Sequence, residues 1–238
     1  MKKKVLTIAL VVALLAIMVS GSLAYFTAQD RVTNTFTVGS VKIEIFENGN
    51  PTDKDSISFG PLTPVVNMDN PSGDESYIGK KVEVKNTGLN AAYVRTHIAI
   101  PANLVGYLYL DLNESGWTRQ TDSTATVEGV EYVVFTYDYN EEVASQTLTS
   151  ELLKGVYLGS DVDLEEDAVG SLWFVKKTNG EIVHRSNFLA HQKNSDGTYT
   201  SAPVNVLVAS QAIQVEGFES GATAALNAGF GANTNPWQ

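Results

Sequence analysis

Residues 25–38 read YFTAQDRVTNTFTV, and this stretch alternates between apolar and polar side chains with a period of two. Its odd-numbered positions are polar apart from Tyr25. Its even-numbered positions are mostly apolar and include Phe26, Ala28, Val32, Phe36 and Val38. Successive side chains of a β-strand point to opposite faces, so the pattern predicts a long strand with one buried face. We interpret residues 25–38 as an N-terminal arm whose five apolar side chains form an assembly face.

The alternation slips by one residue directly after this arm. Beyond Gly39 and Ser40 the apolar residues are Val41, Ile43 and Ile45, which fall on odd-numbered positions. A slip of one residue moves side chains to the opposite face of a strand, so a bulge, bend or hinge is expected here. We predict that Gly39 and Ser40 form a hinge between the arm and the rest of the chain.

The remainder of the chain consists of short apolar runs separated by turn signals. Asn179-Gly180, between the β-rich runs 172–177 and 181–185, is the strongest hairpin signal. Residues 82–85 and 91–100 are expected to pair as a second hairpin. Residues 204–215 are apolar on both phases, which is typical of a strand buried on both faces.

Eight or more short strands with turns between them predict an all-β fold, a single jelly-roll-like β-sandwich domain over residues 39–238. The Ala- and Leu-containing segment 219–231 adds a short C-terminal helix. We expect residues of about 101–168 to form an elaboration of the sandwich.

The first 24 residues have the layout of a secretory signal peptide. Three lysines (residues 2–4) precede the apolar stretch 5–19, and small residues follow at Ser22 and Ala24. The alternative is a retained membrane anchor, but the apolar stretch is shorter than the ~20 residues that a span requires. We predict cleavage between Ala24 and Tyr25 and a secreted protein, located in the extracellular matrix or at the cell surface.

Composition narrows the possible functions. The formal net charge is −11, which disfavours binding to nucleic acid, because phosphate recognition requires a basic face. The chain contains no cysteine, and HExxH, GxSxG and P-loop motifs are absent from the sequence. Its three histidines, His97, His184 and His191, have no standard metal-ligand spacing. We therefore predict that the protein is not an enzyme and has no cofactor.

One acidic segment leaves a metal site open as an alternative. Asp161, Asp163 and Glu165 alternate within the run DVDLEED at 161–167, which we expect to be a solvated loop. Three carboxylates in this order could bind calcium, although the glycine and the spacing of an EF-hand loop are missing.

The stretch SGSLAYFTAQDRVTNTFTVGSVKIEIFE (residues 20–47) resembles the start of the TasA/camelysin family of exported proteins. Weaker similarity recurs at residues 82–95 and 209–218. The resemblance implies processing by a SipW-type signal peptidase and a jelly-roll β-sandwich. It also implies a structural subunit of biofilm-matrix fibres, whose partners are copies of itself and other matrix proteins, with the N-terminal strand of one subunit completing the sheet of the next.

Two other functions remain as alternatives to a fibre subunit. A cell-surface adhesin or binding module would use an aromatic platform, for which Trp117, Trp173 and the Tyr-rich segment 132–139 are candidates. A camelysin-like metalloprotease is less favoured, because no matching metal motif is present. The arm itself has two possible positions, since insertion into a neighbour and folding back onto its own sandwich predict the same alternation.

Overall fold

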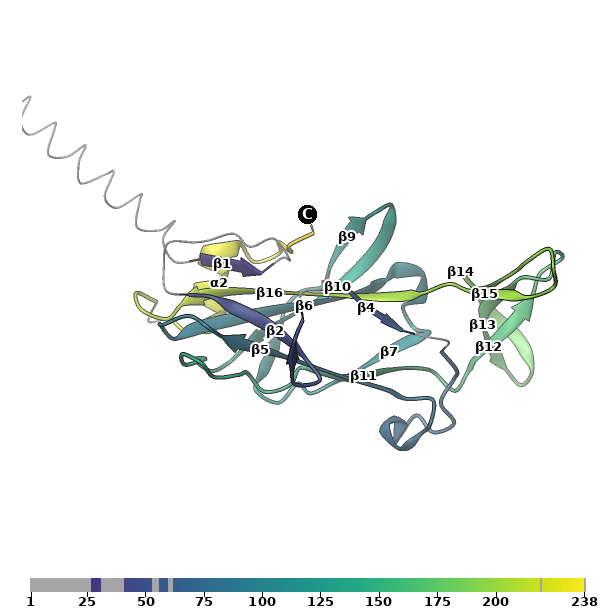
Figure 1. Ribbon diagram of the computed structural model, residues 1–238, viewed down its shortest axis with the longest axis horizontal. Helices are drawn as coiled ribbons and strands as arrows, with labels where there is room; N and C mark the ends of the chain where they lie inside the picture. The colour runs from purple at the N-terminus through teal and green to yellow at the C-terminus, as the bar shows by residue number, and fades with distance from the viewer. Residues whose placement is uncertain (1–26, 31–40, 53–55, 60–61, 219, 238) are drawn as a thin grey trace, which may run out of the picture.

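The computed structural model describes residues 27–30, 41–52, 56–59, 62–218 and 220–237, with backbone alone for 27–30 and 56–59 (Figure 1). Two larger antiparallel sheets, A and B, lie face to face, and a smaller sheet C extends from one end. The short helix α2 (Ala222–Phe230) packs on sheet A toward the other end. The predicted fold class, an all-β sandwich-like fold with a short C-terminal helix, is confirmed.

Sheet A is the larger layer of the sandwich. Its strand order is β1-β16-β6-β10-β8, with β4 pairing with β16 and β9 pairing with β10. The bounds of these strands are β1 Thr27–Asp30, β4 Ser56–Phe59, β6 Ala92–Pro101, β8 Trp117–Arg119, β9 Ser123–Val127, β10 Val130–Tyr139 and β16 Val204–Gln214.

Sheet B faces sheet A across the main core. Its order is β3-β2-β5-β11-β7. The bounds are β2 Ile43–Glu47, β3 Asn50–Pro51, β5 Ile78–Asn86, β7 Leu108–Leu112 and β11 Leu153–Leu158. In β5, Val82 and Val84 are buried while the lysines and glutamate between and beside them are exposed or half-buried. This alternation buries one face against sheet A and leaves the other in water.

Sheet C lies outside the sandwich and consists of four strands in chain order, β12 (Val162–Glu166), β13 (Leu172–Thr178), β14 (Glu181–Lys193) and β15 (Tyr199–Ser201). Phe174 and Ala190 of this sheet join the main core. The sheet is also fixed to the 3-10 turn η2 (Ala102–Leu104), since Ser186 Oγ donates to the carbonyl of Asn103 at 2.8 Å. A second 3-10 turn, η1 (Pro71–Gly73), lies in the connection before β5.

The expected elaboration at about 101–168 is misplaced. That range supplies β10, which lies between β6 and β8 in sheet A, and β11, which lies between β5 and β7 in sheet B. Both strands are therefore interior to the sandwich. The part of the described chain that extends from the sandwich as a separate sheet is instead residues 162–201.

The hairpin predicted from Asn179-Gly180 is confirmed. β13 and β14 meet at the pair Thr178 and Glu181, and the two residues between them have φ values of 53° and 83°. A two-residue turn with both φ angles positive matches the right-handed twist of the flanking strands, and Asn-Gly adopts it at low cost.

The predicted pairing of residues 82–85 with 91–100 is wrong. β5 belongs to sheet B and β6 to sheet A, and Val84 and Val94 belong to one buried cluster between the two sheets. The connection crosses between the sheets because Asn86 Nδ2 donates to the carbonyls of Asn90 and Val143, at 2.7 and 2.8 Å. Apolar faces of adjacent strands can be buried by this stacking as well as by lateral pairing.

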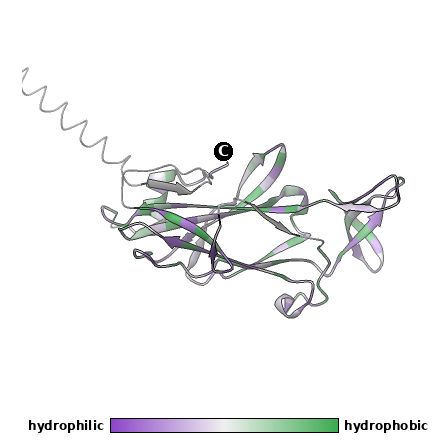
Figure 2. Cartoon of the chain, in the orientation of Figure 1, coloured by the Kyte–Doolittle hydropathy of each residue, from purple (hydrophilic) through white to green (hydrophobic). Residues whose placement is uncertain are grey.

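The outer face of sheet A is also covered, which explains why β16 is apolar on both phases. One part lies under α2, where Ile213 and Tyr93 pack with Ala225 and Leu226. Another lies under the C-terminal tail, where Trp237 joins a buried cluster with Leu207 and Ala209 (the latter two from β16). Figure 2 shows hydrophobic and hydrophilic residues following one another along the strands of the sandwich. The strand at 204–215 is buried on both faces, as predicted.

Within the described residues, no helix has the length and apolar character needed to cross a membrane. The predicted signal peptide, residues 1–24, lies outside the described residues.

Candidate assembly edge

The functional prediction that the structure addresses most directly is the position of the N-terminal arm. β16 pairs with β6 on one side over residues 207–214. On its other side it pairs with β4 over residues 204–207 and with β1 over residues 210–213. We call this second side, from Val204 to Ile213, the β16 edge. In Figure 1, β1 and β4 lie along the same long strand.

Beneath the β1 half of this edge, the two sheets enclose a small apolar cluster. β2 approaches both β1 and β16, so the edges of the two sheets converge there. The buried members of the cluster come from four strands and the adjoining segments: Val41, Ile43, Val84, Ala92, Val94, Val143 and Ala212. A strand that pairs with the β16 edge therefore runs along the margin of the apolar interior.

The register of β1 follows the alternation seen in the sequence. Ala28 pairs with Ala212, and Asp30 pairs with Ser210. Ala212 and Ser210 are the core-facing residues of β16, with 0% of each exposed. Directly opposed residues of an antiparallel pair lie on one face of the sheet. The even-numbered positions of the arm are thus in register with the core-facing positions of β16.

The described strand is paired within its own chain, which is one of the two positions left open by the sequence. Ala28 is the predicted assembly residue that falls within it. The other predicted residues of the arm, hinge and cleavage site lie outside the described residues: Ala24, Tyr25, Phe26, Val32, Phe36, Val38, Gly39 and Ser40.

The outer face of sheet A behind this edge contains a fully buried ion pair. Arg95 of β6 and Asp138 of β10 are directly opposed and both 0% exposed. The guanidinium donates to both carboxylate oxygens, from Nε at 2.6 Å and from Nη2 at 3.0 Å. It also donates to Asn227 Oδ1 at 2.7 Å and to the carbonyl of Gly231 at 2.8 Å. Arg95 thereby fixes the C-terminal end of α2 to sheet A.

His97 lies beside this pair and is held neutral. Its Nδ1 is 2.9 Å from Thr136 Oγ1, and its Nε2 is 3.2 Å from Gln211 Oε1. Burial lowers the pKa of His97 to about 4, outweighing the hydrogen bond to Gln211, which raises it. The nearby charges of Arg95 and Asp138 act in opposite directions. No pattern in the sequence singles out this network as a structural element.

The calcium candidate residues do not converge on one point. Asp161 pairs with Lys176 at 2.7 Å, whereas Asp163 pairs with Lys177 at 2.7 Å and Glu165 lies 3.7 Å from Lys177. Lys176 and Lys177 are consecutive in a strand, so their side chains leave opposite faces. The Lys177 hydrogen bond, together with the backbone of Leu164, lowers the pKa of Asp163.

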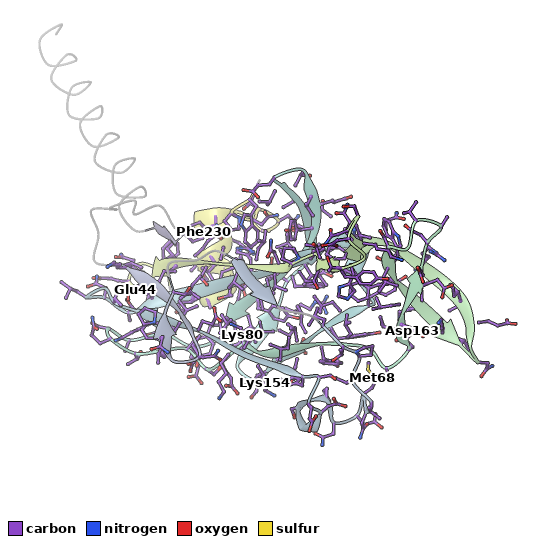
Figure 3. The ribbon with its side chains drawn as sticks, turned by 45° about the vertical axis from the view of Figure 1, so that its right-hand side comes forward. Glu44, Met68, Lys80, Lys154, Asp163 and Phe230 are labelled. Carbon is purple, nitrogen blue, oxygen red and sulfur yellow. The ribbon has the colours of Figure 1, made fainter. Side chains whose placement is uncertain are left out.

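The acidic run is also not a loop as expected, because residues 162–166 form β12, paired with the lysine-bearing β13. Figure 3 labels Asp163 on this small sheet, well apart from Phe230 on α2. Across the described part of the chain, no group of three or more histidine, cysteine or acidic residues is arranged to hold a metal ion.

The two remaining histidines have hydrogen-bonding partners of their own. His184 Nδ1 bonds to Tyr107 Oη, and His191 Nδ1 is 3.0 Å from Ser201 Oγ. They belong to different parts of β14, and neither is joined to His97. The structure thus does not bring the three histidines together.

The aromatic residues proposed as a binding platform are largely core residues. Trp117 and Tyr132 are each 5% exposed and Tyr137 is 0% exposed. Trp173 is half-buried, and its Nε1 donates to Asp167 Oδ2 at 2.9 Å. These side chains pack within the molecule and do not form an exposed platform.

A different aromatic row, which the sequence interpretation missed, lies on the outer face of sheet B. Tyr109 and Tyr157 are cross-strand partners whose rings stack with centroids 5.5 Å apart. The ring of Tyr77 lies 6.4 Å from that of Tyr157, and its hydroxyl donates to Asp111 Oδ2 at 2.9 Å. The available signal was a tyrosine between two inward-facing apolar residues in each strand, as in Leu108-Tyr109-Leu110.

The Tyr77 side chain crosses β11 at Gly155, and this crossing yields a prediction. A Cβ atom at Gly155 would contact the end of the Tyr77 ring and would lie 2.5 Å from the carbonyl oxygen of Ile78. We expect Gly155→Ala to lower the free energy of unfolding by about 1–3 kcal/mol, because overpacking displaces side chain and backbone. The matched control is Gly79→Ala on the facing strand, where the nearest atom is 3.9 Å away. Equal denaturation midpoints for the two variants would contradict this account of Tyr77.

No family model matches the chain, and the searches of curated proteins and of solved structures likewise returned no match.

Proposed function

We propose that the protein is a secreted structural subunit of extracellular fibres or biofilm matrix, assembled by inserting its N-terminal arm into a neighbouring subunit. The observation that supports this proposal is the pairing of β1 with the β16 edge. The described part of β1 lies at the side of its sheet, in a position that an identical strand from another chain can take. Exchange of identical elements between subunits re-forms the same hydrogen bonds, so it costs little.

The geometry of such an exchange favours an open polymer. The arm and the edge that receives it are different surfaces of the subunit, so each contact is head-to-tail. Head-to-tail contacts form rings when the rotation closes and filaments when it does not. The partners in this proposal are copies of the same chain and other matrix proteins, and a SipW-type signal peptidase acts during export.

The proposal includes no enzymatic role. Asp138 lies close in sequence to Glu141 and Glu142, which could suggest a catalytic pair of carboxylates, but its side chain is buried against Arg95.

An adhesin is the second candidate function. The half-buried Tyr77, Tyr109 and Tyr157 favour an adhesin more than the buried Trp117, Tyr132 and Tyr137 do.

Deleting residues 25–34 from the secreted protein tests the fibre proposal. We expect a folded monomer by circular dichroism and sedimentation that forms no fibres by negative-stain microscopy. An unfolded product would mean that the arm belongs permanently to its own subunit, and fibres of normal yield would exclude arm insertion. Phe26→Asp and Val32→Asp should reduce fibre yield more than their polar-face neighbours Thr27→Asp and Thr33→Asp, because a charge on the apolar face must be buried.

Export is tested at the predicted cleavage site. We expect the secreted protein to begin at Tyr25, as measured by intact mass. Replacing Ala24 with Trp should leave the precursor in the membrane fraction, since signal cleavage requires a small residue there. A different mature N-terminus, or normal secretion of the Ala24→Trp protein, would contradict the assignment.

A further inference from the structure

We propose that the whole β16 edge receives the arm of a second copy as one continuous strand, and that β4 is the intramolecular segment which this arm displaces. The inference rests on the proposed function and extends it, because it specifies the full acceptor surface and its competitor. It follows from the registers of β1 and β4.

β1 and β4 occupy successive parts of one edge. β1 pairs with β16 from Thr27 opposite Ile213 to Asp30 opposite Ser210. β4 pairs from Ser56 opposite Leu207 to Phe59 opposite Val204. Both are antiparallel to β16, so they run in the same direction, one after the other. Val208 and Ala209 lie between the parts of β16 that pair with the described residues of β1 and β4, and each is at most 3% exposed.

Extending the β1 register brings the arm onto the positions held by β4. In that register Val32 falls opposite Val208 and Phe36 falls opposite Val204. Residues 33–36 read T-N-T-F, and they fall opposite the same four β16 residues that pair with S-I-S-F of β4. Both segments place a hydroxyl residue opposite Leu207 and Asn205 and a phenylalanine opposite Val204.

The match extends to the two faces of the sheet. Val204, Val206 and Val208 belong to the main core between the sheets. Even-numbered arm residues fall opposite these positions. Val32 and Phe36 are apolar, whereas the polar Asn34 falls opposite Val206, where β4 has Ile57. A change of one residue in register would place the polar residues there instead, so the pattern specifies this register.

The competition between β4 and the arm sets when insertion is complete. β4 is tethered to its own edge, which gives it the advantage of a high effective concentration. A continuous arm that displaces β4 forms one uninterrupted ladder along the β16 edge, from Ile213 to Val204. Insertion is therefore expected to begin at the β1 half and to finish only when β4 has been released.

Paired cysteines in the full secreted chain test the register, and the absence of native cysteine makes each bridge unambiguous. The first variant, Ala28→Cys with Ala212→Cys, tests whether the arm pairs with the part of the edge that β1 occupies. The second variant, Thr35→Cys with Asn205→Cys, tests whether the arm pairs with the part that β4 occupies. Directly opposed residues of antiparallel strands lie within the Cα separation that a disulfide requires. After oxidation of assembled protein, we expect both variants to give ladders of covalent oligomers on non-reducing gels.

The two outcomes that contradict these ideas differ from each other. A ladder from the first variant without one from the second would overturn displacement of β4 and leave arm insertion intact. Intramolecular bridges without a ladder in the first variant would overturn arm insertion, and the present inference with it.

A locked β4 provides an independent measurement. Ser58 and Asn205 are directly opposed, so Ser58→Cys with Asn205→Cys should bridge β4 to β16 within one chain. We expect fibre growth, followed by light scattering, to be at least tenfold slower for the oxidised variant than for the same protein after reduction. The single variant Ser58→Cys is the control, and its fibres should grow at the same rate after oxidation as after reduction. Equal growth of the oxidised and reduced double variant would show that β4 does not need to leave.

Discussion

Asp138→Ala is expected to lower the free energy of unfolding by about 3–5 kcal/mol, a large part of the stability of an ordinary domain. The substitution leaves the Arg95 guanidinium buried and charged, with only the neutral oxygens of Asn227 and Gly231 as acceptors. The side chain cannot reach water without moving α2, because it is 0% exposed beneath that helix. Urea denaturation followed by circular dichroism measures the loss.

The double variant Arg95→Met with Asp138→Leu is the matched control. Replacing both charges by apolar groups of similar volume removes the unpaired charge, so this protein should be more stable than either single variant. Hydrogen exchange should still show a loosened α2, since the substituted methionine has no donor for the carbonyl of Gly231. Single and double variants that are equally unstable would mean that Arg95 acts mainly through α2 and not through Asp138.

Local patterns predicted local structure well. Asn179-Gly180 specifies a two-residue turn through the φ angles of its own residues, and the structure has that turn. The two apolar phases of residues 204–215 required burial on both faces, and the structure covers one face with sheet B and the other with α2 and the C-terminal tail.

Long-range pairing was harder to predict because alternation does not identify the partner of a strand. Residues 82–85 and 91–100 have the pattern of a hairpin, yet they stack across the core in different sheets. The same ambiguity misplaced the elaboration, since the sequences of β10 and β11 do not reveal that each strand has a neighbour on both sides.

The buried polar network was also beyond sequence patterning. Arg95 and His97 lie in a largely apolar strand, but the residues that neutralise or hydrogen-bond them belong to β10, β16 and α2. For the arm, the alternation predicts the phase in which β1 pairs but leaves open whose β16 it meets. Whether the arm pairs with β16 of its own chain or of another depends on the protein concentration and on the tethering of the arm to its own chain. Neither can be predicted from a side-chain pattern.

His97 makes the folded protein sensitive to acid, and this second large effect can be separated from general acid unfolding. In the unfolded chain the histidine has its ordinary pKa of 6.5, whereas in the folded protein burial lowers it to about 4. Between these two pKa values the unfolded state binds more protons than the folded state. The contribution of His97 to the free energy of unfolding is therefore fully present above pH 6.5 and is lost as the pH falls toward 4. We expect a loss of about 2 kcal/mol between pH 7 and pH 5 from this residue alone.

The comparison that isolates His97 is with His97→Gln over the same pH range. Glutamine offers a donor and an acceptor to Thr136 and Gln211 but does not titrate there, so its variant should lose about 2 kcal/mol less on acidification. The groups facing the ring that could interfere are the charges of Arg95 and Asp138, which are common to both proteins. Unfolding free energies measured in urea at pH 7, 6 and 5 give the two slopes. Parallel slopes would show that His97 is protonated equally in the folded and unfolded states, and the assigned burial of a neutral imidazole beside Trp237 would then be wrong.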